Sequence, residues 1–184
     1  MRVIAGEARS LRLVTPKGVH LRPTSDAVRE ALFSSLGSAV PGARFLDVYA
    51  GAGAVGIEAL SRGAGFCAFI ERDRRCVQAI RRNLGNTRLS ARATVVQGDA
   101  RRVTERVLAE HGPFGLVFVD PPYRDPSAAE VAQAILAADS FVLPGWLIFQ
   151  YSKDAPPDGL PAPERVRTFG ETVIASFALP AKGA

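Results

Sequence analysis

The stretch that decides the fold reads Asp47-Val48-Tyr49-Ala50-Gly51-Ala52-Gly53, and it joins a predicted strand to a predicted helix. Gly51 and Gly53 allow tight backbone dihedrals and the close approach of a ligand, and Gly56 falls in the first helical turn, where a side chain would obstruct packing. Glycines at this spacing also occur in turns with a purely structural role. As a cofactor site, the turn would supply contacts from Asp47, Ala50, Gly51 and Gly53.

The rest of the chain repeats this strand-turn-helix pattern. Strands are predicted at 45–49, 66–71, 93–97, 114–120 and 145–151, and helices at about 55–62, 73–84, 100–110 and 127–138. Such alternation predicts right-handed crossovers and a parallel sheet that is covered on both faces. In such sheets the ligand lies at the carboxyl ends of the strands, where the strand order reverses.

The end of the chain departs from this alternation. Two predicted strands, 165–169 and 173–179, are separated only by Gly170-Glu171-Thr172, which predicts a terminal antiparallel hairpin. The predicted fold class is therefore α/β, with the seven-stranded, mostly parallel sheet of the class I methyltransferases (Rossmann-like) and not an all-parallel dinucleotide fold.

Three carboxylates are associated with successive predicted strands: Asp47 lies within the first, Glu71 ends the second, and Asp99 follows the third. Asp47 stands where a pyrophosphate would demand a neutral or positive surface, so it favours a ligand with a cationic amino acid end over NAD. Glu71, next to Arg72, lies 18 residues beyond Gly53 and can accept both hydroxyl protons of a ribose, although it could also cap the next helix. Asp99, next to Ala100, could accept a hydrogen bond from an adenine amine or serve as an N-cap.

A second motif, Asp120-Pro121-Pro122-Tyr123, ends the apolar run 114–119. The Asp120 carboxylate and the Pro121 carbonyl can accept hydrogen bonds from an exocyclic amine, and Tyr123 can stack on its ring. Each proline locks its own φ and pushes the preceding residue into an extended conformation, which holds this geometry. The motif predicts a site for a planar base, with catalytic residues Asp120, Pro121, Pro122 and Tyr123 and no covalent nucleophile.

The amino-terminal residues carry most of the net charge. Residues 1–22 contain five basic residues against Glu7 alone, a net +4 of the chain's +5. Predicted strands at 2–5 and 11–15 make this part a basic β-hairpin extension, followed by a catalytic domain over 23–184. A helix should begin after Thr24 or Ser25 and stop at Gly37. Basic arms attract phosphate backbones, so we expect RNA contacts from Arg2, Arg9, Arg12, Lys17 and Arg22.

Composition narrows the class of protein further. The chain has 184 residues, 47% hydrophobic and 22% charged, which argues against disorder. It lacks a membrane-length apolar run and the apolar block of a signal peptide, so we expect a cytoplasmic protein. Cys67 and Cys76, like His20 and His111, have no metal-ligand spacing, and no metal is expected.

These motifs resemble the RsmD family of bacterial small-subunit ribosomal RNA guanine-N2 methyltransferases. The resemblance extends over nearly the whole chain, from Met1-Arg2-Val3-Ile4-Ala5-Gly6 and the segment 22–33 through the glycine turn and Glu71-Arg72-Asp73 to the Asp-Pro-Pro-Tyr element. It implies S-adenosylmethionine as methyl donor, S-adenosylhomocysteine as product, and as partner 16S ribosomal RNA within the small ribosomal subunit or an assembly intermediate. A monomer is expected. One departure is Tyr49-Ala50-Gly51-Ala52-Gly53, where Phe-Ala-Gly-Ser-Gly is commoner.

Three alternatives stay open. A nicotinamide-dependent oxidoreductase would share the glycine turn but leave Asp120-Pro121-Pro122-Tyr123 and the basic residues unexplained. A non-catalytic RNA-binding protein of ribosome assembly would keep the basic residues with an inert cavity. An adenine-N6 methyltransferase acting on DNA or RNA would use the same Asp-Pro-Pro-Tyr element.

Overall fold

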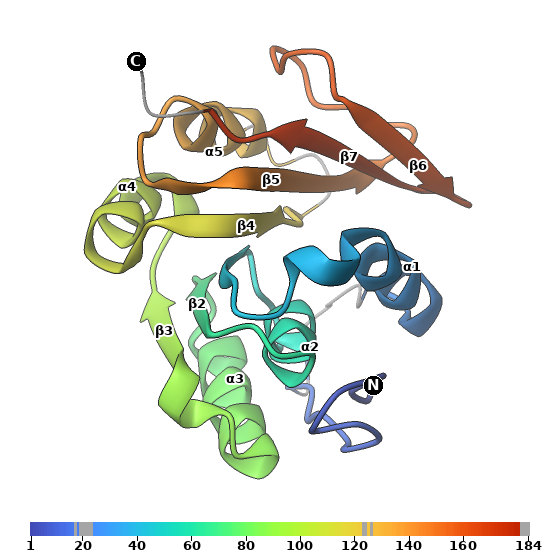
Figure 1. Cartoon of the computed structure of the whole chain (residues 1–184), viewed down its shortest axis with the longest axis vertical. Helices are drawn as coiled ribbons and strands as arrows, with labels where there is room; N and C mark the ends of the chain where they lie inside the picture. Colours follow the sequence, from blue (N-terminus) through green and yellow to red (C-terminus); the bar gives the residue numbers. More distant parts are fainter. Residues whose placement is uncertain (17, 19–23, 123–124, 126, 181–184) are drawn as a thin grey trace.

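The computed structural model describes residues 1–16, 18, 24–122, 125 and 127–180. The strands are β1 (Arg44–Val48), β2 (Phe66–Glu71), β3 (Ala93–Gln97), β4 (Phe114–Val119), β5 (Phe141–Ser152), β6 (Arg165–Phe169) and β7 (Thr172–Ala178). They form one sheet in the order β3-β2-β1-β4-β5-β7-β6 (Figure 1). The first five strands are parallel, and β7 runs antiparallel to both β5 and β6. The predicted seven-stranded sheet with its terminal hairpin is confirmed.

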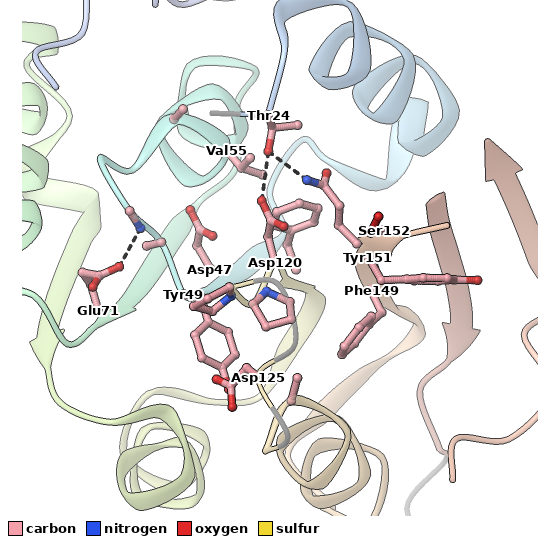
Figure 2. Close-up of a pocket in the computed structure, with 18 of the residues that line it drawn as sticks. Thr24, Asp47, Tyr49, Val55, Glu71, Asp120, Asp125, Phe149, Tyr151 and Ser152 are labelled. Atoms are coloured by element: carbon pink, nitrogen blue, oxygen red, sulfur yellow. Dashed lines mark hydrogen bonds between the residues drawn. The ribbon is translucent and has the colours of Figure 1, made fainter. Parts of the chain in front are cut away.

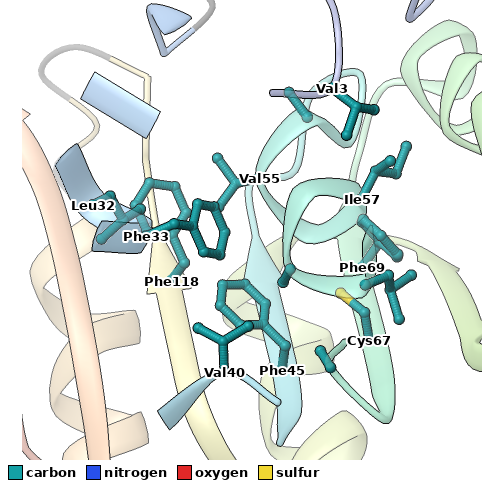
Figure 3. Close-up of a cluster of buried hydrophobic side chains, with 14 of the residues drawn as sticks. Val3, Leu32, Phe33, Val40, Phe45, Val55, Ile57, Cys67, Phe69 and Phe118 are labelled. Carbon is teal, nitrogen blue, oxygen red and sulfur yellow. The ribbon is translucent and has the colours of Figure 1, made fainter. Parts of the chain in front are cut away.

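Helices cover both faces of the sheet. They are α1 (Asp26–Leu36), α2 (Ala54–Ser61), α3 (Arg74–Thr87), α4 (Ala100–His111) and α5 (Ala128–Leu136), with short 3₁₀ turns at Gly37–Ala39 and Ser90–Arg92. The first three helices pack on the face that carries Phe45, Phe69 and Phe118 (Figure 3). The other two pack on the opposite face, against Leu46 and Val117. Alternate residues of each strand therefore serve two separate cores.

The fifth strand begins earlier than its sequence pattern predicts. It starts at Phe141, four residues before the predicted boundary, and includes Pro144. Its pairing with β4 shifts register between Phe114 and Leu116, beside this proline. Proline cannot donate to a ladder and is tolerated in strands at such irregularities.

Residues 1–16 lie against helices α2 and α3 instead of forming a regular hairpin. The expected antiparallel pairing is present only as an isolated bridge between Arg2 and Arg12 and a few backbone hydrogen bonds, so the strands predicted at 2–5 and 11–15 are not formed. Side chains replace strand partners here, because Ile4 N and Ala5 N donate to the Glu58 carboxylate at 2.8 and 3.0 Å. The segment is an ordered part of the structure, and a domain boundary after residue 22 stays a prediction.

Two apolar side chains of the amino-terminal segment are buried in the core. Val3 and Leu13 are buried in the same cluster as Phe33 and Phe45. Further along, the Asn83 side chain binds the backbone of Val14 on both sides, accepting from its N–H at 2.7 Å and donating to its carbonyl at 3.0 Å. A segment with little secondary structure thus satisfies its backbone polar groups through side chains.

The expectation that Gly56 must lack a side chain is confirmed. A Cβ at this position would lie 2.3 Å from Cε1 of Phe69 and 2.7 Å from Sγ of Cys67. Both neighbours are completely buried, so neither can move without disturbing the core. The close contact between α2 and β2 therefore depends on glycine.

We expect Gly56→Ala to lower the free energy of unfolding by about 1–3 kcal/mol, because the added methyl group overpacks a filled site. Gly85→Ala is the matched control. Gly85 lies within α3 with no other heavy atom near its would-be Cβ, and alanine there should stabilise the helix by roughly 0.5–1 kcal/mol. Chemical denaturation measures both changes. A destabilised Gly85→Ala or an unaffected Gly56→Ala would contradict this account of the packing.

Candidate active site

The two motifs meet because β1 and β4 are neighbours in the sheet. Val48, the last residue of β1, pairs in parallel with Val119, the last residue of β4. Beyond the strands, Asp120 N donates to the Val48 carbonyl at 3.3 Å, so the ladder continues into the turn. The strand order reverses between β1 and β4, which is where ligands bind in open α/β sheets. The glycine turn and Asp120 therefore lie at one edge of the sheet.

A cavity of about 880 Å³ opens at this edge. Eight residues predicted as site residues line it: Asp47, Ala50, Gly51, Glu71, Arg72, Asp120, Pro121 and Pro122. Asp99 and Ala100 line a small neighbouring pocket that shares Tyr49 and Glu71 with the large cavity. Gly53 is the N-cap of α2 and is not among the described lining residues. Tyr123 lies outside the residues that the structure describes.

The glycine turn owes its shape to backbone conformations that side chains disfavour. Gly51 and Gly53 adopt φ values of 56° and 81°, and Tyr49 adopts 62°. A left-handed conformation at a residue with a large side chain costs free energy, so the surroundings must hold Tyr49 in place. Burial raises the pKa of the Tyr49 phenol to about 12, and the nearby Asp125 carboxylate acts in the same direction. The phenol therefore stays protonated at neutral pH.

Asp47 caps the helix that follows the turn. Its Oδ2 accepts from Gly56 N at 2.8 Å, whereas the N-cap Gly53 has no side chain that could do so. Burial raises the Asp47 pKa from 3.8 to about 8; the Gly56 N–H opposes this rise, and the Asp120 and Glu71 carboxylates add to it. Without a cationic ligand, this carboxyl group is largely protonated at neutral pH. A positive group in the cavity would favour its charged form.

Glu71 joins the glycine turn to the start of the next helix. Its Oε2 accepts from Gly51 N and its Oε1 from Asp73 N, each at 2.8 Å. Asp73, and not Glu71, is the N-cap of α3, where its side chain accepts from Arg75 N. Each carboxylate oxygen of Glu71 has a second lone pair, which leaves acceptor capacity towards the cavity.

Asp99 caps α4 through a hydrogen bond from Arg101 N at 3.0 Å. This is the capping alternative that the sequence left open. Capping occupies Oδ1 and does not exclude a contact with a ligand, because the carboxylate can accept more than one hydrogen bond. A cofactor role for Asp99 stays a prediction.

The Asp120 carboxylate is held by a chain of polar side chains. Thr24 Oγ1 donates to Asp120 Oδ2 at 3.2 Å, and Gln150 Nε2 donates to Thr24 Oγ1 at 3.4 Å (Figure 2). The Thr24 hydroxyl donates its proton to Asp120, and its oxygen accepts from the Gln150 amide. This order of donors and acceptors leaves Gln150 Oε1 as a buried acceptor without a described partner.

Several lining residues were not predicted from the sequence. Phe149 and Tyr151 lie on one side of Asp120 and Tyr49 lies on the other (Figure 2). Phe149 and Tyr151 come from the carboxyl end of β5, the strand next to β4, with ring centroids 6.2 Å apart. The sequence could have indicated them, because the predicted strand 145–151 should end at the same edge of the sheet as the strand 114–120. No sequence pattern placed Thr24 at this edge, because it precedes a helix.

The amino-terminal segment reaches the cavity with its two ends. Met1, Thr15 and Pro16 contribute to the lining, whereas the turn between them packs against Ser61 at the carboxyl end of α2. Arg2, Arg9 and Arg12 are exposed, and Arg2 Nε lies 3.6 Å from Asp26 Oδ2. Lys17 and Arg22 lie outside the described residues.

Two features that would suggest other kinds of site are absent from the described part of the chain. No group of three or more His, Cys, Asp or Glu side chains there could hold a metal ion. No described helix is both long and apolar enough to cross a membrane.

Comparison with solved structures defines the class of fold. The hypothetical protein TTHA0928 of Thermus thermophilus superposes with a TM-score of 0.82 at 30% identity, over 97% of this chain and 99% of that one. An RNA methyltransferase from Salinibacter ruber, solved with S-adenosyl-L-homocysteine, superposes with a TM-score of 0.67 at 17% identity, over 86% and 94%. The protein has the class I S-adenosylmethionine-dependent methyltransferase fold.

Sequence comparison identifies the family. The model of the family described as conserved hypothetical protein 95 matches residues 1–178. The ribosomal RNA small subunit methyltransferase D of Escherichia coli K12 is 43% identical over 128 residues, which are 67% of this chain and 61% of that relative. The chain belongs to the RsmD family.

The raised Asp47 pKa predicts how stability depends on pH. The folded protein binds a proton at Asp47 up to about pH 8, whereas an unfolded aspartate releases it near pH 4. The contribution of Asp47 to stability is therefore complete below pH 4 and falls as the pH rises towards 8. Asp47→Asn keeps an acceptor for Gly56 N–H and should flatten this dependence.

Denaturation of the ligand-free protein between pH 5 and 8 measures the effect. Parallel curves for the wild type and Asp47→Asn would show that Asp47 is ionised throughout this range.

Proposed function

We propose that the protein transfers a methyl group from S-adenosylmethionine to the exocyclic N2 amine of a guanine in 16S ribosomal RNA. The observation that carries the proposal is that the glycine turn and Asp120-Pro121-Pro122 line one cavity. Family membership supports this reading, because the Escherichia coli relative is a ribosomal RNA small subunit methyltransferase. The substrate would be the small ribosomal subunit or an assembly intermediate.

The lining of the cavity fits this cofactor. S-adenosylmethionine, when bound, supplies a methyl group already activated by a positively charged sulfur. Asp47 and Glu71 give the glycine-turn side of the cavity an acidic lining, which suits a ligand with cationic groups. We assign Glu71 to the ribose hydroxyls, Asp99 and Ala100 to the adenine, and Ala50, Gly51, Gly53 and Arg72 to the remaining contacts. The product complex of the Salinibacter ruber methyltransferase supports this choice of cofactor.

The residues around Asp120 would align the amine. The nitrogen of an aromatic amine is a poor nucleophile because its lone pair is delocalised into the ring. Hydrogen bonds from the amine to the Asp120 carboxylate and the Pro121 carbonyl favour a pyramidal nitrogen, while Pro122 fixes the turn and Tyr123 stacks on the base. In-line alignment of this kind can contribute roughly 7–11 kcal/mol to lowering the barrier. The nitrogen would bond to the methyl carbon as the carbon–sulfur bond breaks, with S-adenosylhomocysteine as leaving group and one amine proton released to solvent, and no covalent enzyme intermediate would form.

The target base must be accessible. An amine within a stacked helix cannot reach the bottom of the cavity, so the base is either flipped out or taken from an unstacked RNA segment. The exposed arginines at positions 2, 9 and 12 belong to the segment whose two ends line the cavity, and they would contact the surrounding phosphates.

The direct test is incubation of the protein with radiolabelled S-adenosylmethionine and small-subunit particles from cells that lack the enzyme, followed by nucleoside analysis. N2-methylguanosine is the expected product. Recovery of N6-methyladenosine would show that the substrate is adenine and not guanine. Absence of any labelled nucleoside would favour a non-catalytic RNA-binding role.

We expect Asp120→Ala to abolish methylation and to spare RNA binding, because the carboxylate contacts the amine and not the phosphates. Asp139→Ala, at an exposed position between α5 and β5, is the matched control and should keep full activity. Methyl transfer and RNA affinity are measured on the same preparations. If the Asp120→Ala variant were active, Asp120 would not be a catalytic residue.

Thr24 should act through Asp120. Thr24→Val removes the donor at nearly constant volume, and loss of a hydrogen bond to a charged group costs about 1.5–3 kcal/mol, which corresponds to about a 10- to 100-fold lower kcat. Thr24→Ser keeps the hydroxyl and should retain most of the activity, while the KM for S-adenosylmethionine stays unchanged in both variants. Equal losses in the two variants would indicate a packing role only.

A further inference from the structure

A second, smaller hollow lies between α1 and the outer strands of the sheet. Its volume is about 130 Å³, and its walls include Leu36 of α1, Trp146 of β5, and Arg165, Arg167 and Phe169 of β6. We call this hollow the β6 groove. It is much smaller than the roughly 300–1,000 Å³ of a typical small-molecule site, so it suits one planar group rather than a whole ligand.

The charge of the groove is positive. Arg165 and Arg167 are exposed, and no carboxylate occurs among the described lining residues. Neither arginine forms an ion pair with any residue that the structure describes. The Arg165 guanidinium lies over the Trp146 ring, 4.9 Å from its centroid. A guanidinium held over an aromatic ring can still donate N–H groups to a phosphate.

The β6 groove continues the wall of the large cavity. Thr172 lines the cavity and pairs directly with Phe169, which lines the groove. Gln150 of the cavity likewise pairs with Ile174 of the groove. Directly paired residues share a face of the sheet and lie about one strand spacing apart, roughly 4.8 Å. The two hollows are therefore adjacent on the face of the sheet against which α1 packs.

We propose that the β6 groove binds a nucleotide that flanks the target base in single-stranded RNA. The flanking base packs against Phe169 and the apolar wall, and its phosphate contacts Arg165 and Arg167. Cationic grooves with aromatic side chains are the usual means of holding unpaired nucleotides. The inference rests on the proposed function, because it assigns the groove to the same RNA whose base enters the large cavity.

The position of the groove gives it a role that the amino-terminal arginines cannot have. Arg2 and Arg12 lie with the segment packed on α2 and α3, whereas β6 is the outermost strand at the other end of the sheet. RNA held at both places would cross the mouth of the cavity. The target base would then be gripped from its two sides.

Trp146 allows a direct test, because it is the only tryptophan of the chain. A short single-stranded oligoribonucleotide, titrated into the full-length protein without methyl donor, should quench Trp146 fluorescence. Arg165→Gln combined with Arg167→Gln should weaken RNA binding several-fold. It should also reduce the slope of log K against log salt concentration by about 1.4, since each single-strand phosphate contact contributes about 0.7.

The matched control is Arg102→Gln combined with Arg106→Gln, which removes the same charge from exposed positions of α4 on the opposite face. It should bind RNA as the wild type does, and both double variants should keep their affinity for S-adenosylhomocysteine. Equal RNA affinity in the two double variants, or Trp146 emission that RNA leaves unchanged, would overturn the inference. A groove variant that changes only self-association would assign the surface to a second copy of the chain, and would overturn it too.

Failure of the proposed function has a different signature. A wild-type protein that binds RNA with quenching of Trp146 but transfers no methyl group would refute the proposed reaction and leave the groove as an RNA site. If the wild type methylates particles and the variant without Arg165 and Arg167 binds RNA equally well, only the assignment of the β6 groove to RNA is refuted.

Discussion

The parallel pairing of β1 with β4 is the constraint on which the site depends. These two strands are far apart in the sequence but adjacent in the sheet, and their last residues, Val48 and Val119, are in register. Both strands therefore end at the same level of the sheet. The Asp120 N–H donates to the Val48 carbonyl and adds one more hydrogen bond to the ladder. A shift of two residues in this register would move the Asp120-Pro121-Pro122 turn by roughly 7 Å relative to the glycine turn. Methyl transfer needs contact distances, so the register is a condition for chemistry.

A second condition is that buried carboxylates serve the structure before any ligand arrives. Asp47 caps α2 and Glu71 binds the backbone of Gly51, so hydrogen bonds within the protein hold the turn in its shape. Glu58 is completely buried, and its oxygens accept from the backbone of Ile4 and Ala5 and from Arg62. Carboxylates without such partners would be costly to bury. The acidic lining of the cavity is thus supported by hydrogen bonds within the protein.

Three carboxylates of the cavity and two groups of exposed arginines occupy different positions. Asp47, Glu71 and Asp120 lie at the carboxyl ends of parallel strands and line the cavity, whereas exposed arginines, besides those on α3 and α4, occur in the amino-terminal segment and along β6. An anionic polymer is attracted to the rim and repelled from the floor. A cationic cofactor experiences the opposite preference. The separation therefore favours two different ligands in one opening without competition between them.

The sequence by itself determined the strands and helices that follow the amino-terminal segment, the glycine turn and the turn that begins at Asp120. These features depend on local periodicity and on the backbone preferences of glycine and proline. Only the tertiary structure decided that Thr24 and Gln150 would hold Asp120, since these contacts join residues 96 and 126 positions apart. It also replaced the expected amino-terminal strands by a segment bound through side chains such as Asn83. Such contacts follow from how helices pack on the sheet, and no local pattern of residues encodes that packing.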